Sequence, residues 1–156
     1  MSIALYRLDD RLIHGQVVVG WGQPLSCRFI VLVDDEVRAS DWEQDLYRMG
    51  VPDSVEVLFA SVEEAASRLP AWEEDARVGI VLVGDIDTAV QLAVRARLRS
   101  LNVGGVHHRP GRVERLRYVY LSPDEAAKLR ALAASGVNVS AQDVPTARPV
   151  PLTEFT

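Results

Sequence analysis

The sequence predicts an α/β fold: one domain spanning residues 1–156, with an open, mainly parallel sheet of about seven strands and helices on both faces. Short apolar segments rich in β-branched residues alternate with longer amphipathic segments along the whole chain. Two of the short segments, 29–33 and 78–83, are almost entirely apolar. That pattern is typical of parallel strands covered on both faces. A length of 156 residues suits a single domain.

Each expected element has its own signal. The expected strands are 3–8, 29–33, 55–59, 78–83, 101–105, 118–121 and 137–141. The expected helices are 17–21, a segment opening at Ser40 and stopping at Gly50, a segment from Ser61 to about Leu69, 88–98, and a segment from Ser122 to Gly136. Each of the three serines is followed three residues later by glutamate, which predicts a capping box. The tail from Pro145 is expected to be extended.

Composition narrows the class of protein. Hydrophobic residues make up 48% of the chain and charged residues 25%, as in soluble globular proteins. The net charge of -5 argues against nucleic acid or a membrane surface as a partner. No apolar run is long enough to span a membrane, the N-terminal residues lack a signal-peptide layout, and Cys27 is the only cysteine. We therefore expect a cytoplasmic protein.

Charge is distributed unevenly along the chain. Residues 34–75 contain thirteen acidic side chains and three arginines, whereas residues 95–117 contain seven arginines and one glutamate. Such runs are usually solvated surfaces. The alternative is a basic face for a phosphate or an acidic partner, on the edge that carries Gly104 and Gly105.

The most informative stretch is Asp9-Asp10-Arg11-Leu12-Ile13-His14-Gly15-Gln16. It lies between the first expected strand and the first expected helix, at the sheet edge where α/β folds bind ligands. The free N–H groups at the start of a helix favour an anion there. A histidine or an Arg–Asp pair at such a position is more often an ordinary surface feature. The whole combination suits a phosphoryl group beside an imidazole.

These residues support phosphoryl transfer without a metal ion or a cofactor. Neutral His14 is the expected nucleophile, and transfer depends mainly on positioning and charge neutralisation. We expect Asp10 to hydrogen-bond one ring nitrogen and fix the tautomer. Arg11 is expected to bind phosphoryl oxygens bidentately, with the N–H groups of Gly15 and Gln16 completing the phosphate site.

The stretch from Asp9 to Val17, with Trp21 beyond it, closely resembles the active-site motif of the IIB components of the mannose/fructose/sorbose-type sugar phosphotransferase system (PTS). Weaker similarities follow in register over nearly the whole chain, at residues 33–37, 102–105, 136–137 and 144–145. The sequence departs from the family pattern at residues 84–87 and 106–108, in loops expected to border the site.

The resemblance implies an open α/β fold and a phosphotransferase activity. It implies that His14 accepts a phosphoryl group from a phosphohistidine on a IIA partner and passes it to a sugar that enters through membrane IIC and IID components. Asp10 and Arg11 match the supporting residues of the family. A homodimer is left open, and nothing in the sequence identifies the sugar.

Two other functions compete with this interpretation. One is a regulatory module, in which phospho-His14 controls binding to a protein and no sugar is handled. The other is a receiver-like or metal-dependent protein that uses the carboxylates of Asp9, Asp10, Asp34 and Asp35. A receiver needs a lysine after its fifth strand, and the only lysine, Lys128, lies in an expected helix.

His107 and His108 follow the glycine pair in the arginine-rich segment. We expect them to belong to a polar loop. The alternative is a second phosphate contact or a metal site, but no third ligand appears at a regular spacing.

Overall fold

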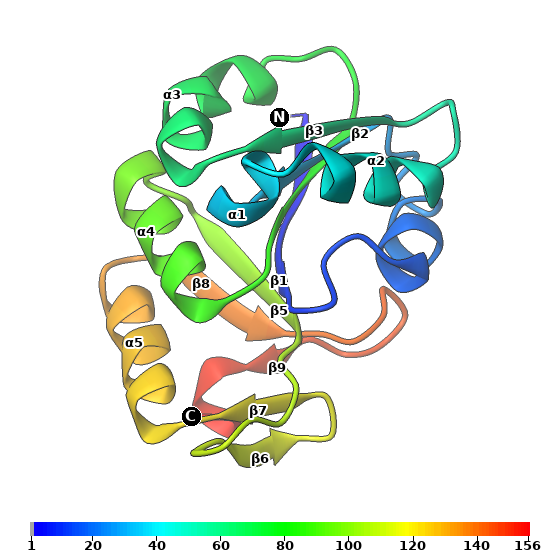
Figure 1. Cartoon of the computed structure of the whole chain (residues 1–156). Coiled ribbons are helices and arrows are strands. Elements are labelled where there is room, and N and C mark those ends of the chain that lie inside the picture. Colours follow the sequence, from blue (N-terminus) through cyan, green and yellow to red (C-terminus); the bar gives the residue numbers. More distant parts are fainter. Residues whose placement is uncertain (1) are drawn as a thin grey trace.

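A mainly parallel sheet forms the centre of the molecule (Figure 1). The computed structural model describes residues 2–156, and within that range the sheet has seven strands in the order β3-β2-β4-β1-β5-β8-β9. All neighbouring strands pair in parallel except β8 and β9, which are antiparallel. The strands are β1 (Ile3–Asp9), β2 (Phe29–Val33), β3 (Glu56–Ala60), β4 (Gly79–Val83), β5 (Ser100–Gly105), β8 (Asn138–Ala141) and β9 (Val150–Pro151). The predicted fold class is confirmed.

Helices cover both faces of the sheet. They are a π-helix (Gln16–Trp21), α1 (Asp35–Arg38), α2 (Asp41–Met49), α3 (Val62–Glu73), α4 (Ile86–Ala96), α5 (Pro123–Ala134) and a 3-10 turn (Leu152–Glu154). Helices α3, α4 and α5 stand in a row along one side (Figure 1). The π-helix, α1 and α2 contribute to the apolar core on the opposite face.

Strand β2 contributes to both cores, because its side chains alternate strictly between the two faces of the sheet. In β2, Phe29, Val31 and Val33 face the core beneath α3, α4 and α5. Ile30 and Leu32 face the core beneath the π-helix, α1 and α2. Because successive strand side chains point to opposite faces, a continuous apolar run is what two covered faces require.

Helix capping follows the prediction at two of three serines. The side chains of Ser61 and Ser122 each accept a hydrogen bond from the glutamate N–H three residues on, and that glutamate side chain accepts one in return. The capping box predicted at Ser40 is wrong, since its side chain makes no capping bond. Ser40 follows the short helix α1, which the sequence did not reveal, and its N–H donates to the carbonyl of Val37.

Three further details differ from the sequence prediction. Helix α3 continues past Pro70 to Glu73, because Trp72 packs into the core beyond the proline. The expected sixth strand, β7 (Val119–Leu121), pairs antiparallel with β6 (Val113–Leu116) in a hairpin outside the main sheet. The C-terminal segment is extended only in part: β9 agrees with the prediction, but the 3-10 turn Leu152–Glu154 follows it.

Tryptophan side chains occupy two kinds of environment. Trp21 and Trp72 are buried in the two cores. Trp42 is 69% exposed, and Leu46 and Met49 on the same helix are also exposed. Helix α2 instead buries Gln44, whose amide donates to the carbonyls of Val37 and Arg38. The inner side of α2 is therefore held by these polar contacts together with Tyr47, which packs against Phe59 in the core.

Within residues 2–156 no helix has the length and apolar character needed to cross a membrane.

Candidate functional site

The His14 loop, residues 10–15, leaves the carboxyl end of β1 near the centre of the sheet. A tight turn begins it: the N–H of Leu12 donates to the carbonyl of Asp9 at 3.0 Å, and Leu12 has a φ of 61°. The Leu12 side chain lies where a Cβ on Gly84 would be, with Cδ2 only 2.4 Å from that position. Glycine after β4 thus makes room for the turn after β1.

Asp9 is the buried centre of the site. Its carboxylate accepts two hydrogen bonds from the Arg11 side chain, at 3.1 and 3.0 Å, and a third from the Arg11 N–H at 3.1 Å. Arg7, also fully buried, donates to the same carboxylate at 3.4 Å. Nε2 of His14 lies 3.3 Å from Asp9 Oδ2. One carboxylate therefore gathers two guanidiniums and an imidazole.

The ionisation of these buried groups follows from their contacts. Burial raises the pKa of Asp9, but interactions with His14 and Arg11 outweigh burial and hold it well below its usual range. Burial lowers the pKa of Arg7, and the neighbouring Asp9 charge opposes that effect. Arg7 also donates to Asn102 and to the carbonyls of Gln142 and Asp143. Asp9 is therefore ionised at neutral pH.

The two ring nitrogens of His14 have different partners. Nδ1 accepts a hydrogen bond from the N–H of Gln16 at 3.2 Å, whereas Nε2 faces Asp9. An acceptor at Nδ1 requires a lone pair there, so the neutral ring carries its proton on Nε2. The His14 carbonyl accepts the N–H groups of Val17 and Val18, which anchors its backbone to the π-helix. The side chain is 19% exposed, so the ring is fixed yet reachable.

Gln16 ties the loop to the segment after β8. Its side-chain amide donates to the carbonyl of Asp143 at 3.1 Å and to the Asp143 carboxylate at 2.8 Å, while its oxygen accepts from Arg11. The Gln16 N–H, expected to face a phosphate, points to His14 Nδ1 instead. Gly15 is exposed, and no atom lies within 4 Å of a Cβ built on it. A phosphoryl group therefore has space beside Gly15.

The structure corrects the role expected of Asp10. Its carboxylate does not contact His14 but accepts from the N–H of His107 at 2.7 Å and contacts His107 Nδ1 at 2.5 Å. The carboxylate beside His14 belongs to Asp9. A strand-period argument would have found it, because residues 7 and 9 share one side of β1, where arginine and aspartate are natural partners.

The glycine pair at the end of β5 lets the two strands' polar side chains approach. A Cβ on Gly104 would lie 2.0 Å from the Arg7 guanidinium carbon. A Cβ on Gly105 would lie 2.9 Å from Asp9 Oδ1 and 3.3 Å from Arg11 Nη2. Only glycine leaves the volume that this charged cluster occupies.

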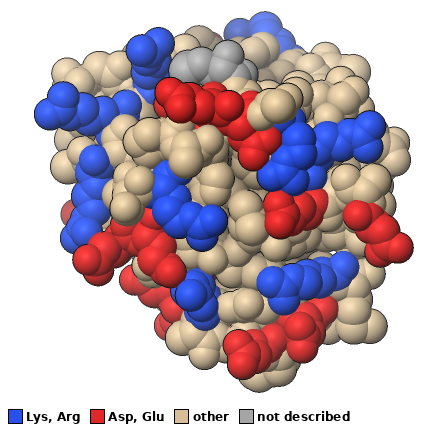
Figure 2. All heavy atoms as spheres, turned by 90° about the horizontal axis from the view of Figure 1, so that it is seen from above, with Lys and Arg blue, Asp and Glu red and all other residues tan. Residues whose placement is uncertain are grey.

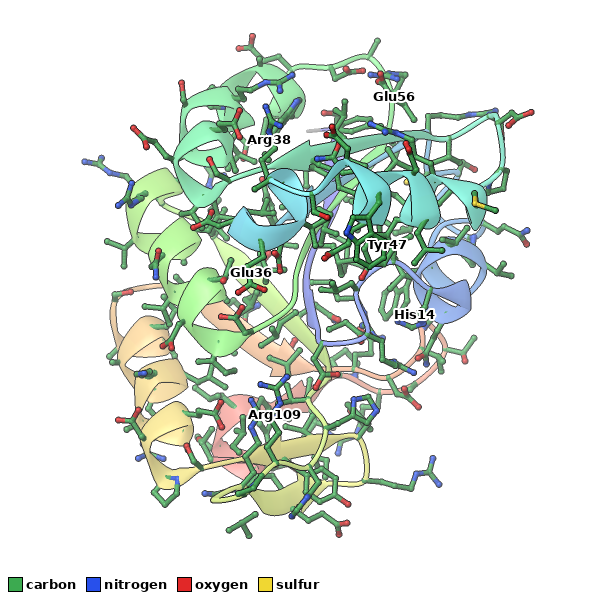
Figure 3. All side chains as sticks on the ribbon, in the orientation of Figure 1. His14, Glu36, Arg38, Tyr47, Glu56 and Arg109 are labelled. Carbon is green, nitrogen blue, oxygen red and sulfur yellow. The ribbon has the colours of Figure 1, made fainter. Side chains whose placement is uncertain are left out.

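A cleft of about 560 Å³ lies beside the His14 loop. Its lining includes Asp10 and Leu12 from the loop, Glu36 from α1 and Arg109 from the segment after β5. In Figure 3, Glu36 and Arg109 lie on opposite sides of this region, with His14 toward the π-helix. The cleft sits off the carboxyl ends of parallel strands, where the fold class places ligands.

The arginine-rich segment does not form one basic face. Arg95 is in the last turn of α4, and Arg97 and Arg99 follow it before β5. Arg109 and Arg112 line the cleft beyond the other end of β5. Two hydrogen bonds bind Arg112 to Glu125, so it is not a free cation. Figure 2 shows the opposite end of the molecule, seen from above Figure 1, where basic and acidic side chains are also interspersed.

The side chains of residues 2–156 include no group of three or more His, Cys, Asp or Glu arranged to hold a metal ion. Lys128 pairs with Asp87 and Asp124 on the helical side of the molecule. Neither feature supports the receiver-like alternative.

Comparison with known proteins supports the resemblance to PTS IIB components over nearly the whole chain. The family model described as "PTS system sorbose subfamily IIB component" matches residues 3–156. The sorbose-specific EIIB component of Klebsiella pneumoniae is 29% identical over 141 residues, covering 89% of this chain and 85% of that protein.

Two crystal structures extend the similarity to the fold. The structure of manxB from Thermoanaerobacter tengcongensis has a TM-score of 0.85 at 31% identity, over 97% of this chain and 93% of that one. The IIBSor domain of the Klebsiella pneumoniae sorbose permease has a TM-score of 0.87 at 27% identity, over 99% and 96%. The chain belongs to the sorbose subfamily of PTS IIB components, the phosphotransferases of a sugar-transport system.

Proposed function

We propose that this chain is a phosphocarrier that accepts a phosphoryl group on Nδ1 of His14 from a phosphohistidine of a IIA partner and passes it to a sugar during uptake. The observation that carries the proposal is that the two ring nitrogens of His14 have different partners. Asp9 faces Nε2, and this leaves the lone pair on Nδ1, on the side where the loop backbone is open.

The transfer step follows from that arrangement. The Nδ1 lone pair forms the new N–P bond as the donor's N–P bond breaks and the donor imidazole leaves. Nε2 keeps its proton, so the phosphorylated ring gains positive charge. The ionised carboxylate of Asp9 lies 3.3 Å from Nε2 and stabilises that charge. In the second half-reaction a sugar hydroxyl oxygen bonds to phosphorus as the N–P bond breaks, Nδ1 recovers its lone pair, and the hydroxyl proton is released to solvent.

Arg11, Gly15 and Gln16 form the phosphate site in this proposal. The Arg11 side chain is 37% exposed while Asp9 holds its Nε and Nη2, so the guanidinium is oriented before the phosphate arrives. The N–H of Gln16 donates to Nδ1 in this structure. Once Nδ1 is bonded to phosphorus, the same N–H donates to a phosphoryl oxygen. Gly15 supplies the open approach.

The partners follow from the family. A PTS IIB component works with a IIA component and with membrane IIC and IID components. We propose that residues 1–156 act as a single IIB domain on the cytoplasmic side of such a membrane assembly. The identity of the sugar is set elsewhere in the assembly, since the phosphate site contacts only the hydroxyl that is phosphorylated.

The test is phosphorylation by a phosphoenolpyruvate-driven relay ending in a sorbose-type IIA protein. We expect acid-labile phosphate on the wild type and none on His14→Ala, with unchanged circular dichroism. His108→Ala, which removes an exposed histidine, is the matched control and should label normally. Undiminished labelling of His14→Ala would refute the proposal.

A further inference from the structure

We infer that His107 is a positioning residue for His14: through Asp10 it fixes the turn that carries the phosphate site. The inference rests on the proposed function and concerns a residue outside the phosphate site itself. His107 comes from the segment after β5, and its contact partner is 97 residues away in the chain.

Three contacts join Asp10 of the His14 loop to the end of β5 and to the segment that follows it. The N–H of Asp10 donates to the carbonyl of Gly105 at 2.8 Å. Its carboxylate accepts the N–H of His107 at 2.7 Å and meets Nδ1 of His107 at 2.5 Å. The Asp10 side chain is 12% exposed while that of His107 is 59% exposed. The imidazole therefore shields Asp10 from water on its outer side.

His107 is itself held from the far side. Arg112 donates to the His107 carbonyl at 2.8 Å and makes two further bonds, at 2.9 and 2.8 Å, to Glu125 on α5. The Arg112 side chain is only 9% exposed. A continuous series of polar contacts thus runs from α5 through Arg112 and His107 to Asp10.

Asp10 is well placed to transmit this support. It lies between Asp9, which faces the His14 ring, and Arg11, which is expected to bind phosphate. The turn that follows includes Leu12 at a φ of 61°, a conformation that a leucine rarely adopts unless its surroundings impose it. Asp10 therefore holds the first part of a turn that ends in a strained residue.

The contact between His107 and Asp10 requires a hydrogen-bond donor at the position of Nδ1, and a positive charge alone does not replace it. With Nδ1 held by a carboxylate, the ring presents N–H at that atom whether it is neutral or protonated. The side-chain nitrogen of asparagine occupies nearly the same place as Nδ1 and also carries hydrogen. His107→Asn should therefore preserve the contact, whereas His107→Ala removes it.

The experiment compares two donors on His107→Ala, His107→Asn and His108→Ala. One donor is the phosphorylated IIA-type protein, and the other is phosphoramidate, a small phosphoryl donor that needs no docking surface. We expect His107→Ala to lower the maximal rate of His14 phosphorylation about tenfold with both donors, with little change in KM. His107→Asn should restore most of the rate, and His108→Ala should match the wild type.

Several results would overturn the inference. A defect with the protein donor alone would make His107 a docking contact, and equal rates for wild type and His107→Ala would exclude any role. Failure of His107→Asn to exceed His107→Ala would exclude the donor argument.

Amide hydrogen exchange provides a readout independent of phosphorylation. In His107→Ala the amides of residues 10–12 should exchange faster than in wild type or His108→Ala. If wild type fails to label on His14, the proposed function fails, yet faster exchange still supports the link to the loop. Unchanged exchange would refute that link.

Discussion

Asp9 illustrates how a single buried side chain organises the site at the scale of residues. A buried carboxylate is tolerated only with strong partners, and Asp9 has Arg7, Arg11 and His14. Removing its charge leaves Arg7 as an uncompensated buried cation. Asp9 therefore supports both the fold and the ring orientation.

We expect Asp9→Asn to lower the free energy of unfolding at pH 7 by about 3–5 kcal/mol. The pKa of Asp9 is lower in the folded state than its ordinary 3.8, so the folded protein binds fewer protons than the unfolded chain. The stabilisation is complete above that ordinary value and is lost as pH falls further. The gap between wild type and Asp9→Asn should therefore narrow in acid, as measured by urea unfolding at several pH values.

Asp53→Asn, at an exposed position, is the control and should keep the wild-type stability at both ends of the range. A constant gap between Asp9→Asn and wild type across the acid range would show that the charge of Asp9 is not what stabilises the fold.

The sequence indicated the chemistry of the site but not every pairing in it. An acid, an arginine and a histidine within six residues predict their association, but the sequence alone assigns His14 the neighbouring Asp10 in place of Asp9. The distinction depends on where β1 ends. Asp9 is still in the strand and points inward with Arg7, whereas Asp10 begins the turn and points to His107. Contacts with His107, Gln142 and Asp143 join distant segments, which local patterns do not reveal.

At the scale of elements, the end of β5 is shaped to fit the polar side of β1. The Arg7 guanidinium occupies the space beside Gly104, and partly buried hydrogen bonds to Asn102 and to two carbonyls hold it there. The flexible end of an arginine side chain can normally move aside when a neighbouring residue gains a methyl group. The hydrogen-bond partners of Arg7 on several segments prevent this movement.

Gly104→Ala should therefore lower the free energy of unfolding by about 1–3 kcal/mol, because the new methyl group overlaps the guanidinium. Chemical denaturation of the purified variant measures this. Gly50→Ala is the control: its Cβ would meet nothing closer than 3.8 Å, and its effect should be small. Equal stability of Gly104→Ala and wild type would show that Arg7 is free to move.

Elements with a long, regular pattern were predicted well, and short ones were not. The strands β2 and β4 and the helices capped by Ser61 and Ser122 were evident from apolar runs and capping residues. The four residues of α1 and the two of β9 carry no periodic signal. The apolar alternation of β7 identified a strand but not the β6 partner, because pairing depends on the tertiary fold.

At the scale of the whole molecule, arginines that are close in sequence lie at opposite ends of the strands. Arg109 is at the cleft beside the His14 loop, whereas Arg95 is near the end of α4. Both side chains are exposed and carry the same charge. They form a matched pair for testing whether a phosphorylated donor approaches the cleft edge.

Arg109→Ala should slow phosphoryl transfer from the IIA-type donor about twofold to fivefold at low salt, since a cation near the site attracts the donor's phosphate. Arg95→Ala should have no effect. Added salt should remove the difference, because exposed charges are screened beyond about 8–10 Å. Stopped-flow transfer rates at two ionic strengths test this, and equal slowing by both variants would indicate a net-charge effect.

The unequal burial of the tryptophans gives the protein an optical reporter of its own site. Trp21 donates its indole N–H to the carbonyl of Asp143, and the Arg7 guanidinium lies 4.9 Å from its ring centre. Its emission therefore senses the electric field of the cluster around His14. The Trp42 side chain is exposed to solvent and is accessible to aqueous quenchers such as iodide. Trp72 lies in the core on the other face of the sheet. In a Trp42→Phe background, a change in fluorescence on phosphorylation would come from Trp21, and the reaction would be followed in real time without any attached dye.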